Sequence, residues 1–211
     1  MMKVKCKRLI GRITISIIAI VLLSGCRAST PPVEFYTLNP VIGLSEEGQP
    51  QANVRQNLAV GVGPMEMPKS IDRPQLVTRT APNTLSVNEF HRWAGSMRED
   101  FMRALATNLA VLLHTNQVTA YPWEDYFRPV YQIFLDVHRF DGEVGNHLVL
   151  DITCTITDRD GRRALYVHKS RIEEPLPETD FDALVSAQNR TIATLSRQLA
   201  QIIIKLEAGT I

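Results

Sequence analysis

The stretch 147-HLVLDITCTITDRDGRRALYVH-168 decides the fold that we expect. Between residues 147 and 157, apolar and polar residues alternate, which is the pattern of a β-strand with one buried face. Asp158-Arg159-Asp160-Gly161 follows, and an Asp-Gly pair supplies the positive φ that tight hairpin turns need. Residues 165–168 then return as a partner strand. The stretch therefore predicts an antiparallel hairpin with one side facing a core.

The chain on both sides of this hairpin extends the pattern. Residues 131–138 alternate in the same way and predict a further strand. We expect Asp141-Gly142-Glu143 and Gly145-Asn146 to interrupt the chain before the hairpin begins. Downstream, Thr179 or Asp180 can cap a last helix. Its apolar stripe consists of Phe181, Leu184, Val185, Ile192, Leu195, Leu199, Ile202 and Leu206.

The first half of the chain is less regular. Short strands are predicted at 35–38, 57–63, 76–78 and 85–88, with Pro64 and Pro68 ending the second of them. A helix is predicted over about 89–114, and its apolar face comprises Trp93, Met97, Phe101, Leu105, Leu109 and Leu112. Strands that are polar on one side need cover only on the other. We therefore predict a single α+β domain, a mainly antiparallel or mixed sheet with two long helices packed on one face.

The first 26 residues have the pattern of an export signal. Five cations lie within positions 3–12, and an apolar run at 13–23 follows. This run is too short for a membrane span, which needs about 20 residues, but is typical of a secretory signal peptide. The exit, Leu23-Ser24-Gly25-Cys26, resembles the bacterial lipobox, in which the cysteine is acylated and becomes the first mature residue. The alternative is an ordinary signal peptide with a chance cysteine.

These features predict three segments: a lipoprotein signal peptide at 1–25, a lipidated tether at 26–34 and a folded domain at 35–211. The eight tether residues after Cys26 reach at most about 26–29 Å, so we expect the domain to work close to its membrane. Arg27 follows the lipidated cysteine, and by resemblance to the usual sorting pattern this favours the periplasmic face of the outer membrane. Loss of Cys6 with the signal and lipidation of Cys26 leave Cys154 as the only thiol.

Composition limits the function classes. The chain has 211 residues, of which 45% are hydrophobic and 21% are charged, as suits one globular domain. Beyond the signal, 18 basic and 22 acidic residues leave a net charge of −4. A mildly acidic body does not attract polyphosphate, so we expect no nucleic acid partner.

Motifs that carry chemistry are missing from the sequence. The five histidines (His91, His114, His138, His147 and His168) show no metal-binding spacing, although His138 and His168 fall on predicted strands and could meet. Gly61-Val62-Gly63 is followed by Pro64 and opens no helix, whereas a dinucleotide-binding loop must lead from a strand into a helix. The sequence therefore does not predict a dinucleotide site. Cys154 alternates into the apolar set, as a core thiol does. We expect no catalytic residue, no cofactor and no metal, with an undetected enzyme as an alternative.

Residues 65–79 are distinctive. Two prolines stiffen this segment between two short strands, and we expect it to expose Arg73, Gln75 and Arg79. It is either a loop over the sheet edge or a docking loop, because prolines reduce the entropy lost on binding.

The same segment carries a family resemblance. Ile71-Asp72-Arg73-Pro74-Gln75-Leu76-Val77-Thr78-Arg79, then Arg92-Trp93-Ala94 and Arg139-Phe140-Asp141-Gly142, resemble the ABC-type transport auxiliary lipoproteins, a family that includes paraquat-inducible protein C. Two departures are Cys154, where a tryptophan is frequent, and Gly95-Ser96, where an acidic residue and proline are usual. The lipobox and the Phe35-Tyr36-Thr37-Leu38 opening also match.

The resemblance implies a non-catalytic accessory of an MCE-type phospholipid transport system, with an ABC transporter in the inner membrane and an MCE-domain protein bridging the periplasm. The partner-docking residues would be Asp72, Arg73, Pro74, Gln75 and Arg79. A second hypothesis is a lipid carrier that holds an acyl chain between sheet and helices. Homo-oligomerisation is a further expectation, since Ile202-Ile203-Ile204 exceeds what one helix face needs.

Overall fold

The computed structural model describes residues 31–41 and 58–211. The chain divides into two compact units, Met1–Pro32 and Val33–Ile211, and every helix and strand of the described residues lies in the second. The predicted signal peptide and Cys26 lie outside the described residues. Within the described part, neither helix is long and apolar enough to cross a bilayer.

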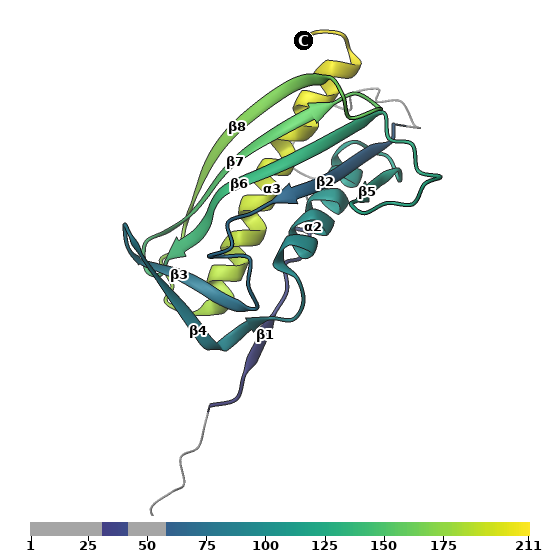
Figure 1. The fold of residues 1–211 in the computed structure, drawn as a ribbon. Coiled ribbons are helices and arrows are strands. Elements are labelled where there is room, and N and C mark those ends of the chain that lie inside the picture. Colours follow the sequence, from purple (N-terminus) through teal and green to yellow (C-terminus); the bar gives the residue numbers. More distant parts are fainter. Residues whose placement is uncertain (1–30, 42–57) are drawn as a thin grey trace, which may run out of the picture. The chain divides into compact units, whose positions relative to one another are not determined.

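A five-stranded sheet forms one layer of the domain (Figure 1). Its strand order is β5-β2-β6-β7-β8, with parallel pairing from β5 to β6 and antiparallel pairing from β6 to β8. The predicted hairpin is confirmed, and β8 is longer than expected and ends at Pro175. The strands are β2 (Val60–Glu66), β5 (Val118–Ala120), β6 (Tyr131–Glu143), β7 (His147–Thr157) and β8 (Ala164–Pro175).

Two helices, α2 (Met97–Leu112) and α3 (Phe181–Glu207), cover one face of this sheet. Figure 1 shows α3 behind the long strands β6, β7 and β8, with α2 beside β2 and β5. The alternation of β7 explains the packing, because every second side chain points to the helices and is fully buried. These side chains are Leu148, Leu150, Ile152, Cys154 and Ile156. The predicted α+β class, with two helices packed on a sheet, is confirmed.

The two helix starts compare differently with the prediction. Asp180 caps α3 as expected, since its carboxylate accepts a hydrogen bond from the backbone N–H of Ala183 at 2.7 Å. The other helix does not begin near residue 89. Ser96 is its N-cap, accepting from the N–H of Glu99, and residues 84–93 form a strand instead. Trp93 fits the helical spacing by coincidence, since it is the buried last residue of that strand.

The sheet is divided in two, which the sequence pattern does not predict. A separate three-stranded sheet has the order β1-β4-β3 and comprises β1 (Glu34–Tyr36), β3 (Gln75–Ala81) and β4 (Thr84–Trp93). β1 runs parallel to β4, and β3 runs antiparallel to it. The expected strands at 76–78 and 85–88 thus lie in the first halves of β3 and β4.

Three further expectations about strands are corrected. Pro64 lies inside β2, where the register with β6 shifts between Val62 and Met65, so the ladder does not need its missing N–H. Asp141-Gly142-Glu143 continues β6 and pairs with the start of β7. Gly142 is there for space, because a Cβ would lie 2.8 Å from Cδ1 of Leu184 on α3. Strand β5 is an addition to the predicted set.

Candidate functional site

The segment predicted to dock a partner forms a tight turn between β2 and β3, which we call the docking turn (residues 68–75). The carbonyl of Pro68 accepts hydrogen bonds from the N–H groups of Ile71 and Asp72, both at 3.0 Å. The side chain of Ile71 is buried in the core beneath the turn. Backbone bonds and one buried anchor therefore hold the turn in a fixed shape.

The charged residues of the docking turn have different partners. Asp72 forms an ion pair with Arg98 on the first turn of α2. The Nε of Arg73 donates to the side-chain oxygen of Gln75 at 3.2 Å, and Gln75 donates to Glu89 on β4 at 3.4 Å. Within residues 31–41 and 58–211, no carboxylate pairs with Arg73. Its positive charge is therefore held in place and left uncompensated.

Arg79, further along β3, is fastened inside the fold. Its guanidinium donates two hydrogen bonds to the carboxylate of Asp141 on β6, both 2.8 Å long. Arg139 adds a third at 3.0 Å. Burial of Asp141 opposes its ionisation, but the hydrogen bonds from the two arginines outweigh burial and hold its pKa below the usual value. Arg79 therefore joins the two sheets.

These contacts correct the expected exposure. The sequence predicts that Arg73, Gln75 and Arg79 project from the loop, but all three are half-buried. Pro74 is the exposed residue among the predicted docking residues, and Asp72 is half-buried against α2. Side chain to side chain hydrogen bonds lay the arginines along the surface, which residue type alone does not indicate.

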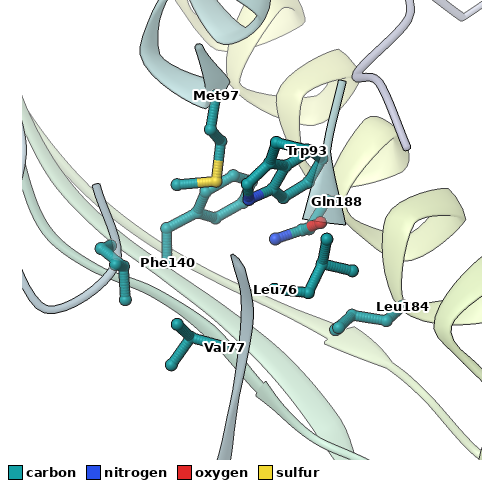
Figure 2. Close-up of a pocket in the computed structure, with 8 residues that line it drawn as sticks. Leu76, Val77, Trp93, Met97, Phe140, Leu184 and Gln188 are labelled. Atoms are coloured by element: carbon teal, nitrogen blue, oxygen red, sulfur yellow. The ribbon is translucent and has the colours of Figure 1, made fainter. Parts of the chain in front are cut away.

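A small cavity lies beneath the docking turn, between the three-stranded sheet, β6 and α3 (Figure 2). Its volume is about 10 Å³, which is room for about one water molecule. Figure 2 shows the amide of Gln188 among apolar side chains, and its Oε1 has no hydrogen-bond partner in the described part of the chain. The lining residues are Ile71, Leu76, Val77, Trp93, Met97, Phe140, Leu184 and Gln188.

This cavity bears on the carrier hypothesis. A cavity of about 150 Å³ is needed to hold even benzene, and an acyl chain is larger. The space found between sheet and helices is far below that. Trp93 closes it as a core residue that is 5% exposed, so a contact role for this side chain is not indicated.

An open cleft of about 280 Å³ lies beside the docking turn. Asp72 and Arg98 line it from one side, and Glu99, Met102 and Tyr121 complete it. Nothing in the spacing of these last three residues marks them as surface partners of the turn. For Tyr121, the run of aromatic residues just after position 120 is a signal that could have indicated a surface role. The proline at 122 by itself indicates only a break in secondary structure.

The segment that leaves the predicted tether is firmly attached. The hydroxyl of Tyr36 on β1 donates to Glu34 at 2.7 Å and lies 2.9 Å from Nδ1 of His91 on β4. Burial and the Glu34 carboxylate raise the pKa of Tyr36. Thr37 then donates to Asp100 on α2 at 2.8 Å. Residues 36 and 37 are thus fastened to β4 and α2.

The remaining candidates for chemistry are separated. His138 lies 3.0 Å from the hydroxyl of Thr153 on one side of the large sheet, whereas His168 contacts Gln198 of α3 at 2.9 Å on the other. No metal-binding group of three was found among the described residues. Cys154 is fully buried, and burial raises its thiol pKa to about 12, as expected for a core residue.

The triple isoleucine near the C-terminus is mostly used inside the fold. Ile202 and Ile203 are buried in the core, and Ile204 is half-buried against it. The observation that suggested homo-oligomerisation is therefore explained by packing within one chain.

Comparisons with known proteins agree with the family resemblance that the sequence shows. The model of a family described as the ABC-type transport auxiliary lipoprotein component matches residues 36–200. A solved structure of a Xanthomonas campestris protein is 16% identical, with a TM-score of 0.64, and covers 86% of this chain and 97% of its own. A second, of an uncharacterised protein, is also 16% identical, with a TM-score of 0.66 and coverages of 82% and 99%. A search of curated proteins gave no match.

Proposed function

This chain belongs to the ABC-type transport auxiliary lipoprotein family, and from that premise we propose that it serves an MCE-type system that moves phospholipid between membranes. The family description makes it an auxiliary lipoprotein component of ABC-type transport. The finer assignment, a non-catalytic module that docks the MCE-domain bridge protein, is our proposal. It rests on the docking turn and on the lack of any assembled catalytic group among the described residues.

The anchor is the first part of this proposal. Cys26 would carry the lipid, after removal of residues 1–25, and residues 26–34 would tether the domain that starts at residue 35. Multi-chain acylation gives effectively permanent attachment, since each buried methylene contributes about 0.8 kcal/mol. We place the anchor in the outer membrane, with the domain on the periplasmic side, because Arg27 follows the cysteine.

One observation carries the docking role: the guanidinium of Arg73 is held in a fixed turn with no compensating carboxylate in the described part of the chain. An arginine that is already ordered loses little side-chain entropy on binding, and arginine is frequent among residues that dominate interfaces. Asp72, Pro74, Gln75 and Arg79 keep its surroundings rigid. We propose that this group meets an acidic site on the MCE-domain protein.

The size of the cavity supports separate roles for this chain and the MCE assembly. The cavity between the small sheet, β6 and α3 holds about one water, so the described residues that line it leave no room there for an acyl chain. Lipid would pass through the MCE assembly, and this chain would position the end of that assembly at the membrane. No observation favours the carrier hypothesis over docking.

The test is recovery of the MCE-domain protein on the full-length, tagged lipoprotein extracted from membranes. Arg73→Ala should reduce recovery at least fivefold, because it removes the fixed charge, and among the described residues the side-chain hydrogen bond that it breaks is the one to Gln75. The matched control is Arg162→Ala, an exposed arginine in the β7–β8 turn. Equal recovery with both variants and with the unaltered chain would remove the role of the turn. No recovery with the unaltered chain would remove the proposed function.

A further inference from the structure

The loop between β5 and β6 carries an aromatic group that the docking turn does not explain. Tyr121 and Trp123 meet edge to face with ring centres 5.5 Å apart, and Phe127 follows at 6.0 Å. The ring of Trp123 packs on Gly61 of β2, where a Cβ would come within 2.7 Å of it. We call residues 121–128 the aromatic loop. Its packing against β2 gives it a defined conformation.

Two members of the aromatic loop face solvent. Tyr126 is 86% exposed and Tyr121 is 46% exposed. Tyrosine and tryptophan are enriched at the centres of protein interfaces, since they offer large contact area with few rotatable bonds. An exposed tyrosine beside a fixed tryptophan is typical of a contact surface.

Hollows lie on both sides of the end of β2, next to this loop. The first is the open cleft that Glu99, Met102 and Tyr121 line beside the docking turn. The second is a groove of about 170 Å³ on the outer face of the large sheet, lined in part by Glu66 and Phe134. Gly63 and Pro64 are adjacent to one hollow each: a Cβ on Gly63 would lie 2.7 Å from Met102 and Tyr121, which line the cleft, and Pro64 lines the groove.

Several carboxylates of this region are exposed, whereas Asp136 in the groove lies 3.8 Å from Nδ1 of His138. Glu66 in the groove and Glu99 in the cleft are exposed and form no ion pair with any other described residue, and the same holds for Glu124 and Asp125 on the aromatic loop. Of the cations nearby, Arg98 is paired with Asp72, and Arg128 at the end of the aromatic loop is exposed. Acidic side chains therefore outnumber basic ones around the aromatic side chains, in contrast to the positive docking turn.

We propose that the cleft, the groove and the aromatic loop form a second half of the docking surface, and that they bind a positively charged segment of the partner protein. Lysine or arginine side chains of that segment would meet Glu66 and Glu99, and its apolar side chains would pack against Tyr121 and Tyr126. This inference rests on the proposed function. A bilayer surface is the less favoured occupant, because anionic headgroups are repelled by unpaired carboxylates.

The experiment measures the affinity of the full-length lipoprotein for the MCE-domain protein in detergent. Glu66→Lys/Glu99→Lys should weaken binding at least tenfold in 50 mM salt, and the difference should shrink in 500 mM salt. Tyr126→Ala should weaken binding at least fivefold at both salt concentrations. The controls are Glu178→Lys, another exposed acid, and Phe35→Ala, an aromatic residue that is 65% exposed on β1; neither should change the affinity.

The outcomes separate the two proposals. If the unaltered chain binds and Arg73→Ala weakens it, but the charge reversal and Tyr126→Ala bind as their controls do, this inference is wrong and the docking turn stands. If the unaltered chain does not bind, the proposed function fails. A membrane role would appear as quenching of Trp123 fluorescence by vesicles of brominated phosphatidylcholine, with buried Trp93 as the unquenched reference, and that result would also overturn the inference.

Discussion

The two sheets of this domain are stabilised in different ways. Along β6 and β7 of the large sheet, the side chains directed at the helices are apolar and buried, apart from Gly142 and the hydroxyl of Tyr131, which donates to Glu207 on α3, so the hydrophobic effect dominates. The small sheet also buries Leu76 and Trp93. Polar side chains fasten it in addition: Arg79 to Asp141, Tyr36 to His91 and, just after β1, Thr37 to Asp100. The first arrangement builds the domain, and the second positions a surface on it.

This difference explains why the candidate docking residues lie where they do. A contact surface needs polar groups in fixed positions, and polar groups are fixed only by hydrogen bonds that the fold provides. The small sheet supplies these bonds to Arg73 through Gln75 and Glu89. Substitutions in each sheet should reveal whether the loss in free energy of unfolding differs between the two, as their side-chain contacts do.

The largest effect is expected in the core. Phe140 is buried against Phe101 at a ring distance of 5.3 Å, edge to face. Phe140→Ala should lower the free energy of unfolding by about 3–5 kcal/mol, because it removes apolar contact and leaves a cavity. Urea unfolding measures this loss, and Val167→Ala on the exposed face of β8 is the control, with a change below about 0.5 kcal/mol. Similar losses for both would contradict a hydrophobic origin.

A smaller but distinctive loss is expected at the link between the sheets. Asp141→Ala should cost about 1.5–3 kcal/mol, since it removes hydrogen bonds to two charged guanidinium groups. The pKa of Asp141 is lowered in the folded state, so its contribution is present above the unfolded pKa of about 3.9 and is lost as pH falls further. Unfolding of Asp141→Asn should therefore depend less on pH below about 4. An unchanged slope would show that Asp141 is not the linked group.

A further step down is expected at the strand that follows the tether. Tyr36→Phe keeps the ring and removes a hydroxyl that bonds to Glu34 and contacts His91. The expected cost is about 0.5–1.5 kcal/mol. Hydrogen exchange should show faster opening of residues 34–38 without a change in β7, whereas uniform acceleration would mean that β1 does not open separately.

The smallest effect on stability is expected in the docking turn itself. Arg73→Ala should change the free energy of unfolding by less than about 0.5 kcal/mol, because the side chain is half-buried and donates only to Gln75 in the described contacts. Thermal unfolding measures it. A loss above about 1.5 kcal/mol would assign Arg73 to the fold rather than to a partner.

Sequence pattern predicts the large sheet well and the small sheet poorly, for a physical reason. The alternation in β7 and the apolar stripe of α3 repeat over many residues, so the buried face of each element can be recognised from the sequence. The helix predicted at 89–114 starts too early because Trp93 lies four positions before Met97, the spacing of a helix face. The cap at Ser96 and the pairing of β4 with β3 decide otherwise, and strand pairing is a tertiary contact that local spacing does not contain.

The candidate site is predictable only in part. The prolines and arginines locate the docking turn, but the capture of Arg79 by Asp141 depends on two strands about 60 residues apart in sequence and leaves no local signal. Met102 and Tyr121 escape prediction for the same reason, since they come together only over Gly63 of β2.

The most direct test of the central claim, an anchored accessory domain, is the intact mass of the full-length product isolated from outer membranes. We predict a chain that begins at Cys26, with the added mass of lipid on that residue. A chain that begins elsewhere, or an unmodified chain recovered free of membranes, would contradict the claim.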